Sequence, residues 1–339
     1  MNISDLFNPY SYAMQLRRAL YKKGTARSER VSVPVISIGN LSMGGTGKTP
    51  VTLALAKYCI ETLHKKTAVV LRGYKRKSTG YLLVSDGQKI LQNVSQSGDE
   101  AQIYAVELLQ AIVICDEEKT DGARNAIALG AEVILLDDGF QHLSLQRDLN
   151  ILLINSDEGI PAVFPFGKGR EGYSAASDAD IIIYTNSENK NIAAGTQGKP
   201  VVTARTVLKS VSLYPSNEIT GSLPQFFSGK RILVLSGIAN PGRFEKSVAE
   251  YSASTIPYPL KDHAEYDRAV LEKIISKAKA ERCDAIAATT KDAVKILGLY
   301  QEMQKKDASA PPLMICHAEI EFISGREILF TKINDLFKS

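Results

Sequence analysis

The stretch that decides the fold is NLSMGGTGKTP (Asn40–Pro50). It lies between VPVISIGN (Val33–Asn40), a short apolar run typical of a strand, and VTLALAKYCIETLHKK (Val51–Lys66), which is typical of a helix. A glycine-rich turn in this position lets backbone N–H groups surround a phosphate at the N-terminus of the helix. We therefore predict a nucleotide-binding loop in which Lys48 contacts the β- and γ-phosphates and Thr49 binds Mg²⁺.

This loop departs at one position from the standard pattern G-x-x-x-x-G-K-[ST], because Ser42 replaces the first glycine. The alternative is a glycine-rich turn that carries a Lys-Thr pair by chance, and the flanking strand and helix argue against it. The predicted nucleotide-binding residues are Gly44, Gly45, Thr46, Gly47, Lys48 and Thr49.

Short apolar runs alternate with longer helix-like segments through most of the chain. The alternation continues from the loop to residue 185 and resumes, on a smaller scale, between residues 231 and 310. Nearly continuous apolar runs separated by helices indicate a parallel sheet that is covered on both faces. We predict an α/β fold of the P-loop NTPase (RecA-like) type, with a mostly parallel sheet flanked by helices and a second, smaller α/β domain.

The length of 339 residues fits about two domains. We expect an N-terminal membrane-interface helix, a P-loop nucleotide-binding kinase domain, an extended linker, a smaller α/β domain, and a return strand followed by a C-terminal helix. Their predicted bounds are 1–30, 31–200, 201–225, 226–310 and 311–339.

The composition excludes several classes of protein. The net charge of +4 is small for a dedicated nucleic-acid binder, and the four cysteines lack the spacing of metal or redox motifs. We expect them to be buried, reduced thiols of a cytosolic protein. No segment has the ~18 consecutive apolar residues of a membrane span, and the N-terminus lacks the pattern of a signal peptide. We expect a monomer on the cytoplasmic side.

Two acidic residues follow another apolar run, in VILLDDGFQH (Val133–His142). The run delivers Asp137 and Asp138 to the carboxyl edge of the predicted sheet, where carboxylates can hold Mg²⁺ directly or through water. A paired aspartate after a strand can also be a simple turn or helix cap. Its occurrence together with the phosphate loop favours the metal site.

A kinase also needs a base near the acceptor hydroxyl. Asp99 stands with Glu100 at a predicted helix start in SQSGDEAQIYA, where an aspartate also serves as an N-cap, and the spacing leaves both roles open. His263, in KDHAEYD, lies in a charged loop of the second domain, where a lone histidine is usually solvated. In the segment LRGYKRK (residues 71–77), the basic residues begin with Arg72, next to a strand, and suit an anionic substrate.

The segment LFNPYSYAMQLRRALYKKG (Leu6–Gly24) predicts a helix that begins at Pro9. Its polar side chains gather at a basic end. This pattern suits an amphipathic helix at an anionic lipid surface and equally a helix packed on the domain. The basic residues are Arg17, Arg18, Lys22 and Lys23.

The motifs GNLSMGGTGKTP, RGYKR, GDE, LLDDGFQH, SGIANPGRF, DHAEYD and TTKDAVK resemble, in this order, those of the tetraacyldisaccharide 4′-kinase (lipid A 4′-kinase) family. The resemblance runs from Gly39 to Lys295. It implies that ATP, with Mg²⁺, phosphorylates the 4′-hydroxyl of an acylated glucosamine disaccharide 1-phosphate to give lipid IVA. It also implies a peripheral protein on the cytoplasmic face of a Gram-negative inner membrane.

The resemblance further assigns roles to individual residues. It implies that Asp99 is the base, assisted by His263, with closure of the two domains completing the site. It places Thr49, Asp137, Asp138 and Glu171 at the metal, and Arg72, Tyr74, His142 and Arg170 at the substrate's sugar and phosphate groups.

The sequence departs from the family pattern at three places, none of which touches the proposed base, phosphate lysine or paired aspartates. Lys75 stands where the family tends to have glycine, Thr290 where it tends to have glutamate, and REGY replaces a REP-like run.

A different class remains as the alternative: a P-loop NTPase switch or metallochaperone that acts on a protein partner. The unpaired cysteines argue against metal delivery.

Overall fold

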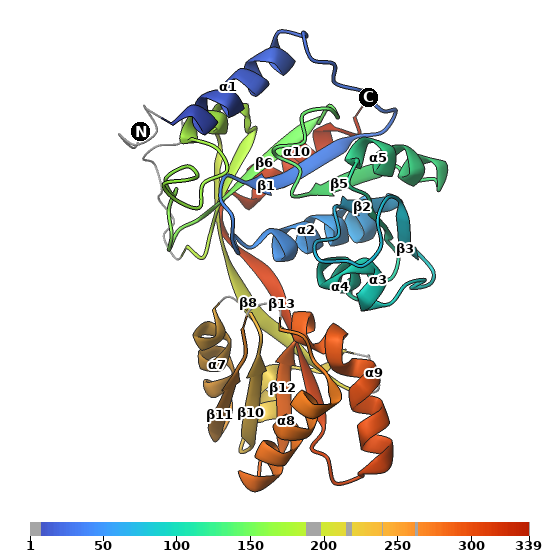
Figure 1. The fold of residues 1–339 in the computed structure, drawn as a ribbon, viewed down its shortest axis with the longest axis vertical. Helices are drawn as coiled ribbons and strands as arrows, with labels where there is room; N and C mark the ends of the chain where they lie inside the picture. The colour runs from blue at the N-terminus through green and yellow to red at the C-terminus, as the bar shows by residue number, and fades with distance from the viewer. Residues whose placement is uncertain (1–7, 188–197, 215–218, 239, 262–263, 339) are drawn as a thin grey trace. The chain divides into compact units, whose positions relative to one another are not determined.

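The computed structural model describes residues 8–187, 198–214, 219–238, 240–261 and 264–338. It divides into two compact units, the first made of Met1–Thr206 with Ile320–Ser339 and the second of Val207–Glu319 (Figure 1). The strands β8 (Val201–Leu213) and β13 (Leu313–Ser324) each contribute residues to both units.

The first unit is built on a sheet that has β1 (Val35–Asn40), buried along its whole length, among its inner strands. The neighbours of β1 are parallel to it, and the edge strand β3 (Leu82–Asp86) runs antiparallel to β4. The remaining strands of the order β7-β6-β1-β5-β2-β4-β3 are β2 (Thr67–Leu71), β4 (Ile112–Cys115), β5 (Val133–Asp137), β6 (Leu149–Asn155) and β7 (Ile181–Thr185).

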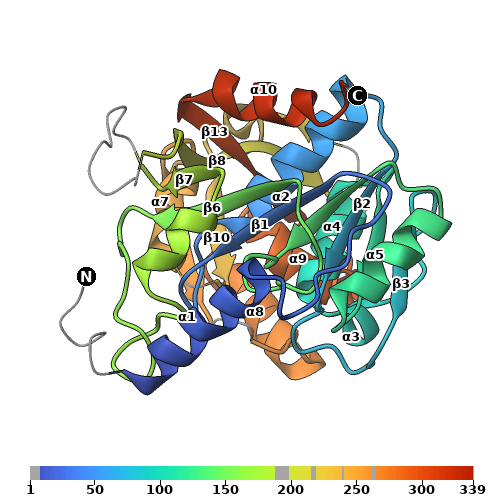
Figure 2. The same ribbon diagram turned by 90° about the horizontal axis from the view of Figure 1, so that it is seen from above.

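Helices cover both faces of this sheet (Figure 2). On one face, Ala123 and Ala126 of α5 pack against alternate residues of β1, β2, β4 and β5. On the other face lies α2, which begins directly after the glycine-rich loop. This packing buries both sides of every central strand, which is why their sequences are continuous apolar runs. The helices of the unit are α1 (Pro9–Lys22), α2 (Lys48–Lys57), η2 (Tyr58–Thr62), α3 (Val94–Ser97), α4 (Asp99–Glu107), α5 (Lys119–Ala128), η3 (Tyr173–Asp178) and α10 (Arg326–Asp335).

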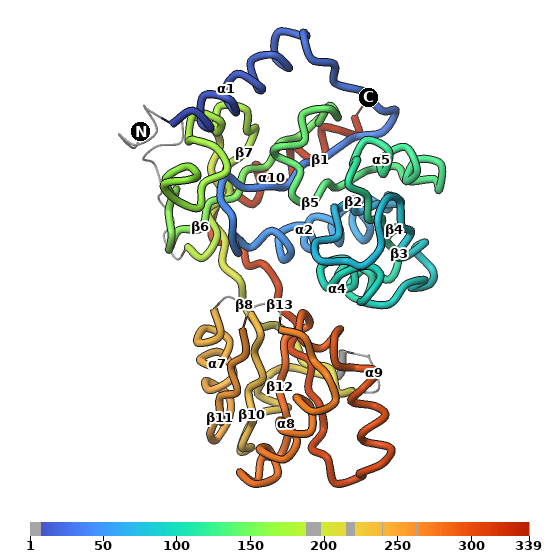
Figure 3. The backbone as a smooth tube through the Cα atoms, viewed as in Figure 1, coloured from blue at the N-terminus to red at the C-terminus, as the bar shows by residue number. Residues whose placement is uncertain are grey.

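The second unit has its own parallel strands, in the order β11-β10-β12-β13. Two apolar clusters lie on either side of them, one around Leu233 and Ile274 and the other around Phe227 and Phe244. Its other elements, traced in Figure 3, are β9 (Ile219–Gly221), α6 (Leu223–Phe227), β10 (Arg231–Ser236), α7 (Pro241–Ala249), β11 (Ser254–Pro259), α8 (Arg268–Ala280), β12 (Ala285–Thr289) and α9 (Thr290–Lys306).

These features confirm the predicted α/β fold with a mostly parallel sheet flanked by helices. All four cysteines are buried and free, as expected, and burial raises the pKa of the Cys59 and Cys115 thiols to about 12. None of the helices in the described part of the chain has the length and apolar character needed to cross a bilayer.

Candidate active site

The glycine-rich loop connects the end of β1 to the start of α2. Asn40, the last residue of β1, donates a side-chain hydrogen bond to Thr46 Oγ1 at 2.7 Å, and Thr185 donates to the Thr46 carbonyl at 2.9 Å. Gly47 has a φ of 78°, in the left-handed region where a Cβ is disfavoured, and it caps the N-terminus of α2. The loop is therefore fixed at both sides and brings the helix N-terminus to the carboxyl edge of the sheet.

Lys48, the first residue of α2, links this loop to the acidic pair. Its Nζ lies 3.4 Å from Asn40 Oδ1 and 3.4 Å from Asp138 Oδ1. Thr49 follows in the first turn of the same helix. The ammonium group thus lies between the glycine-rich loop and the acidic pair at the end of β5.

Asp137 ends β5 with its side chain almost fully buried, at 2% exposure. Its Oδ2 accepts a hydrogen bond from the Tyr104 hydroxyl at 2.9 Å, whereas its Oδ1 has no hydrogen-bond partner in the part of the chain that is described. Burial raises the pKa of Asp137, and the nearby Lys48 opposes that shift. A buried carboxylate oxygen without a donor is a suitable ligand for a cation.

Asp138 begins the turn of residues 138–142, which we call the β5 turn. Its φ of 53° is left-handed, which is uncommon for a residue other than glycine. Arg170 Nη1 donates to both carboxylate oxygens, at 2.8 and 2.6 Å. Burial disfavours the charged form, but Lys48 and Arg170 outweigh it and hold the pKa of Asp138 well below its usual range. This carboxylate therefore stays ionised.

The structure adds Lys119, which sequence reasoning missed. It is the first residue of α5, only 5% exposed, and its Nζ donates to the carbonyl oxygens of Asp137 and Asp138 at 2.6 Å each. Burial lowers the pKa of Lys119, and the two aspartates act in the opposite direction. A lysine at a helix start in a charged stretch is usually solvated, so no local signal separates it from its neighbours.

Asp99 is the first residue of α4 and is 6% exposed. Gly98, with a φ of 81°, is the N-cap, and Asp99 Oδ1 accepts a hydrogen bond from the Glu100 backbone at 3.0 Å. A Cβ on Gly98 would come within 2.8 Å of the Tyr74 carbonyl oxygen, so the turn after β2 packs directly against the start of α4. This contact brings two of the predicted site residues, Asp99 and Tyr74, to neighbouring positions.

Glu100 is a second residue whose involvement the sequence did not reveal. Burial, together with the negative charge of Asp137, raises its pKa to about 7, and Lys48 acts in the opposite direction. The start of α4 therefore faces the acidic pair and the phosphate lysine. His263, the predicted assistant of Asp99, lies outside the described residues.

Residues 72–77, which follow β2 and which we call the β2 turn, carry two predicted substrate residues. Arg72 is exposed, Tyr74 is 54% exposed, and the Lys75 ammonium lies 5.6 Å from the Tyr74 ring centroid. Arg76 points inward instead, where it pairs with Glu117 at 2.6 Å. In this turn Arg76 therefore supports the structure, whereas Arg72 faces the solvent.

His142 is half-buried at the end of the β5 turn. Its Nε2 lies 3.3 Å from the Thr120 hydroxyl and 3.1 Å from the Ser144 hydroxyl. Burial, followed by the positive charges of Lys119 and Arg147, lowers the pKa of His142 to about 4. The imidazole is neutral near pH 7 and can exchange hydrogen bonds with hydroxyl groups.

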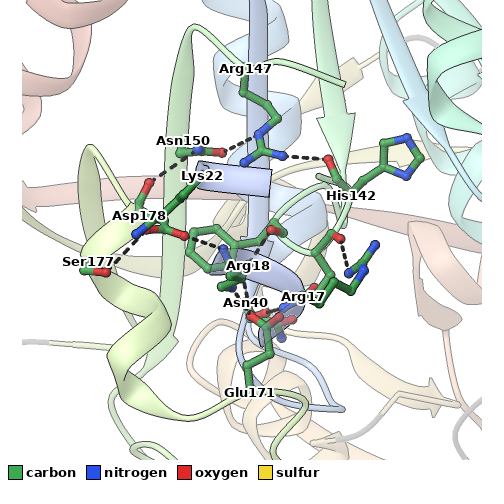
Figure 4. Close-up of polar contacts among 12 residues, drawn as sticks. Arg17, Arg18, Lys22, Asn40, His142, Arg147, Asn150, Glu171, Ser177 and Asp178 are labelled. Carbon is green, nitrogen blue, oxygen red and sulfur yellow. Dashed lines mark hydrogen bonds and ion pairs between the residues drawn. The ribbon is translucent and has the colours of Figure 1, made fainter. Parts of the chain in front are cut away.

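Glu171, a predicted metal ligand, is bound to the N-terminal helix (Figure 4). Arg18 donates to Glu171 Oε2 from Nε at 3.0 Å and also from Nη2, whereas Oε1 has no hydrogen-bond partner among the described residues. Within the described ranges, no three His, Cys, Asp or Glu side chains are grouped to hold a metal on their own. The role of Glu171 as a ligand stays a prediction.

Helix α1 packs on the first unit through one side. Its N-cap Asn8 donates to the Phe164 carbonyl at 2.9 Å, and Arg17 donates to the Gln141 carbonyl at 3.0 Å. Its other side exposes large apolar side chains, so a packed face and an exposed face occur on the same helix. These side chains, spaced four residues apart, are Tyr12 (53% exposed), Leu16 (61%) and Leu20 (38%).

Comparison with known proteins gives consistent results. The family model described as Tetraacyldisaccharide-1-P 4′-kinase matches residues 5–337. The chain is similar to the tetraacyldisaccharide 4′-kinases of Desulfotalea psychrophila (36% identity, covering 87% of each chain) and Syntrophotalea carbinolica (37% identity, covering 85% of this chain and 80% of the relative). Its fold is similar to the crystal structure of LpxK from Aquifex aeolicus in complex with ATP, with a TM-score of 0.76 at 26% identity, over 97% of this chain and 96% of that one.

Proposed function

We propose residue roles and a membrane surface for this chain, which belongs to the tetraacyldisaccharide-1-P 4′-kinase family. It is a lipid kinase that uses ATP to phosphorylate the 4′-hydroxyl of tetraacyldisaccharide 1-phosphate in lipid A biosynthesis. Membership favours this activity over that of an NTPase switch or metallochaperone. The observation that carries the residue roles is the contact of Lys48 with Asp138 at the end of the phosphate loop.

The phosphates of ATP bind to the loop Gly44–Thr49 and to the N-terminus of α2. Backbone N–H groups at a helix start and the positive end of the helix dipole both favour an anion there. Lys48 adds a full positive charge that offsets the charge developing on the transferring phosphoryl group. Asn40 and Thr185 fix the loop, so little reorganisation accompanies nucleotide binding.

The residues present suit Mg²⁺. The buried Asp137 Oδ1 lacks a hydrogen-bond donor among the described residues, and the Thr49 hydroxyl stands at the start of α2. Mg²⁺ is usually held by one or two carboxylates together with phosphate oxygens and water, rather than by a complete cage of side chains. We assign it to Thr49, Asp137 and Asp138, with Glu171 as a further candidate. When bound, it neutralises phosphate charge and orients the γ-phosphoryl group.

Asp99 is the base that accepts the proton of the 4′-hydroxyl, assisted by His263. It is buried at the start of α4, next to Glu100, whose pKa responds to the charges of Asp137 and Lys48. Tyr74 packs against the same helix start, and Arg72 is exposed on the same turn. Arg72, Tyr74, His142 and Arg170 contact the sugar and phosphate groups of the substrate.

The apolar side of α1 is the membrane-facing surface. Phe164 (51% exposed) and Phe166 (62%) extend it, because the Phe164 ring contacts Tyr10 with centroids 5.8 Å apart. Aromatic and aliphatic side chains on one side of a helix suit insertion at the headgroup level. Of the four basic residues, Arg18 is buried, Lys22 pairs with Asp178 and Arg17 donates to the Gln141 carbonyl, so we assign the attraction to anionic lipid to the exposed Lys23. The protein is peripheral, on the cytoplasmic face of the inner membrane.

The reaction is tested by incubating the purified protein, Mg²⁺ and γ-labelled ATP with the disaccharide 1-phosphate in mixed micelles. Label should enter the lipid, and Lys48→Met should reduce transfer roughly 10²-fold or more. Asp99→Asn and His263→Ala should each reduce turnover by about 10²–10⁴-fold, the range of general-base catalysis. The double variant should lose far less than the product of the two single losses if the residues act together. Fully multiplicative losses would show that they act independently.

The membrane surface is tested separately by flotation with vesicles containing anionic lipid. Leu16→Ser and Phe166→Ser should reduce the bound fraction while activity on a detergent-dispersed substrate is retained. Thr62→Ser, a conservative change outside this surface, is the matched control. Unchanged vesicle binding in both variants would contradict the assignment of this surface.

A further inference from the structure

We infer that Arg18 of α1 is a positioning residue for phosphoryl transfer, because it holds the β5 turn and the segment that carries Arg170 in a fixed relation. Its guanidinium touches both segments directly, and it is only 7% exposed. Neither the phosphate-loop motif nor the pattern of α1 assigns it a role inside the kinase site. The inference rests on the role proposed above for Asp138.

The β5 turn needs support from outside, because Asp138 has a left-handed backbone. A residue with a Cβ adopts this conformation only when its surroundings stabilise it. Three basic side chains supply that stabilisation. Lys119 donates to the carbonyls of Asp137 and Asp138, Arg170 to the Asp138 carboxylate, and Arg18 Nη2 to the Phe140 carbonyl at 3.2 Å.

Arg18 uses all three nitrogens of its planar fork (Figure 4). Nε and Nη2 donate to Glu171 Oε2, and Nη1 donates to Asp178 Oδ2 at 2.8 Å. The guanidinium also lies 4.7 Å from the Phe140 ring centroid. An arginine can make such a set of contacts because its donors are fixed in one plane, whereas a lysine cannot.

Through these contacts Arg18 holds residues next to both Asp138 and Arg170, which form an ion pair. Phe140 lies two residues after Asp138, and Glu171 directly follows Arg170. The β5 turn also packs closely on β1, because a Cβ on Gly39 would lie 2.6 Å from Phe140 Cβ. Removal of Arg18 therefore leaves Glu171 buried without its hydrogen-bond donor. It also lets the β5 turn move away from the segment that carries Arg170, which would weaken the contacts of Asp138 with Arg170 and Lys48.

The test compares Arg18→Met, which keeps the aliphatic stem, with Lys22→Met. Lys22 lies on the same helix and pairs with the same Asp178, but its side chain is 60% exposed, and its ion pair in the described part of the chain is to Asp178 and not to the β5 turn. We would measure kcat, the KM for ATP, thermal unfolding, and Mn²⁺ binding by electron paramagnetic resonance with a non-hydrolysable ATP analogue. Residues that orient metal ligands typically contribute 10–100-fold in affinity or activity.

We expect Arg18→Met to weaken Mn²⁺ binding and to lower kcat by roughly 10–100-fold. Lys22→Met should stay within about twofold of the wild type, because surface ion pairs contribute little. Arg18→Lys keeps the charge but loses the fork, so it should show an intermediate loss and decides the matter if Arg18→Met does not fold. A merely structural role would lower the melting temperature without changing Mn²⁺ affinity per folded molecule.

Wild-type Mn²⁺ affinity and kcat in a folded Arg18→Met or Arg18→Lys protein would overturn the inference. Asp138→Asn, measured in parallel, separates this outcome from a failure of the proposed site. If Asp138→Asn is fully active, the role given to Asp138 is wrong. If Asp138→Asn is inactive while both Arg18 variants behave as wild type, only the role of Arg18 is wrong.

Discussion

The β5 turn and the β2 turn follow neighbouring parallel strands but differ in how their charged side chains are placed. Each contains a non-glycine residue in the left-handed region, Asp138 with a φ of 53° and Lys75 with a φ of 60°. In the β5 turn Asp138 is paired with Arg170 and partly buried, whereas in the β2 turn Arg72 and Tyr74 are exposed. Two turns of similar backbone shape thus have different tasks: one fixes reacting groups, and the other meets a ligand from solvent.

The largest effect on activity is expected from a substitution of Asp138. Asp138→Gly should relieve an unfavourable backbone conformation that costs about 1 kcal/mol, yet it should lower kcat by roughly 10²–10³-fold because the carboxylate is lost. We would measure kcat, its Mg²⁺ dependence and the free energy of unfolding. Asp138→Ala is the control, with the same loss of charge but no relief. An active Asp138→Gly enzyme would mean that the carboxylate is structural.

The β2 turn should respond differently to the loss of a charge. Arg72→Ala should raise the KM for the lipid substrate about tenfold and change kcat little, because it removes a contact made before the transition state. Lys77→Ala on the same turn serves as the control for general loss of positive charge. A large fall in kcat with unchanged KM would place Arg72 at the transferring phosphoryl group instead.

The β5 turn should also be the more sensitive of the two to acid. Because the folded protein lowers the pKa of His142 to about 4 from its ordinary value, the unfolded chain binds the extra proton first as the pH falls. His142 therefore does not reduce the free energy of unfolding above about pH 6.5. Between about pH 6.5 and pH 4 it lowers the free energy of unfolding progressively. Melting temperatures at pH 7.5 and 5.5 should differ less in His142→Asn than in the wild type. An equal difference would show that His142 contributes nothing to this dependence.

The smallest effect is expected at Lys75. Lys75→Gly should stabilise the protein by about 1 kcal/mol through relief of its left-handed conformation. Activity should be retained, in contrast to the same kind of change at Asp138. Chemical denaturation with paired activity measurements would check both points. Loss of activity in this variant would mean that the Lys75 side chain also contacts the substrate.

The sequence predicted those parts of the site that are local in the chain. The strand, loop and helix around Lys48 could be predicted because an apolar run, glycines and a helical segment follow one another directly. Asp137 and Asp138 could be placed because the carboxyl ends of parallel strands share one edge of the sheet.

The remaining parts depend on long-range contacts that no local pattern encodes. Arg18 and Glu171 meet across 153 positions of the chain, and Lys119 lies 18 residues before the carbonyl that it contacts. For α1 the sequence left a packed helix and an interfacial helix open. In the structure Arg18 is buried against the domain while Leu16 is exposed, so the packing of α1 is observed and its role at a membrane surface stays a prediction.

The burial of the four thiols has a practical consequence for fluorescence work. A thiolate is the species that reacts with a maleimide, so buried thiols with raised pKa values should label slowly in the native protein. A single probe introduced by Leu16→Cys should then report its surroundings without removal of any native cysteine. An environment-sensitive dye at that position should shift its emission to the blue when vesicles are added, while the same dye at Lys57→Cys, on the far end of α2, should not.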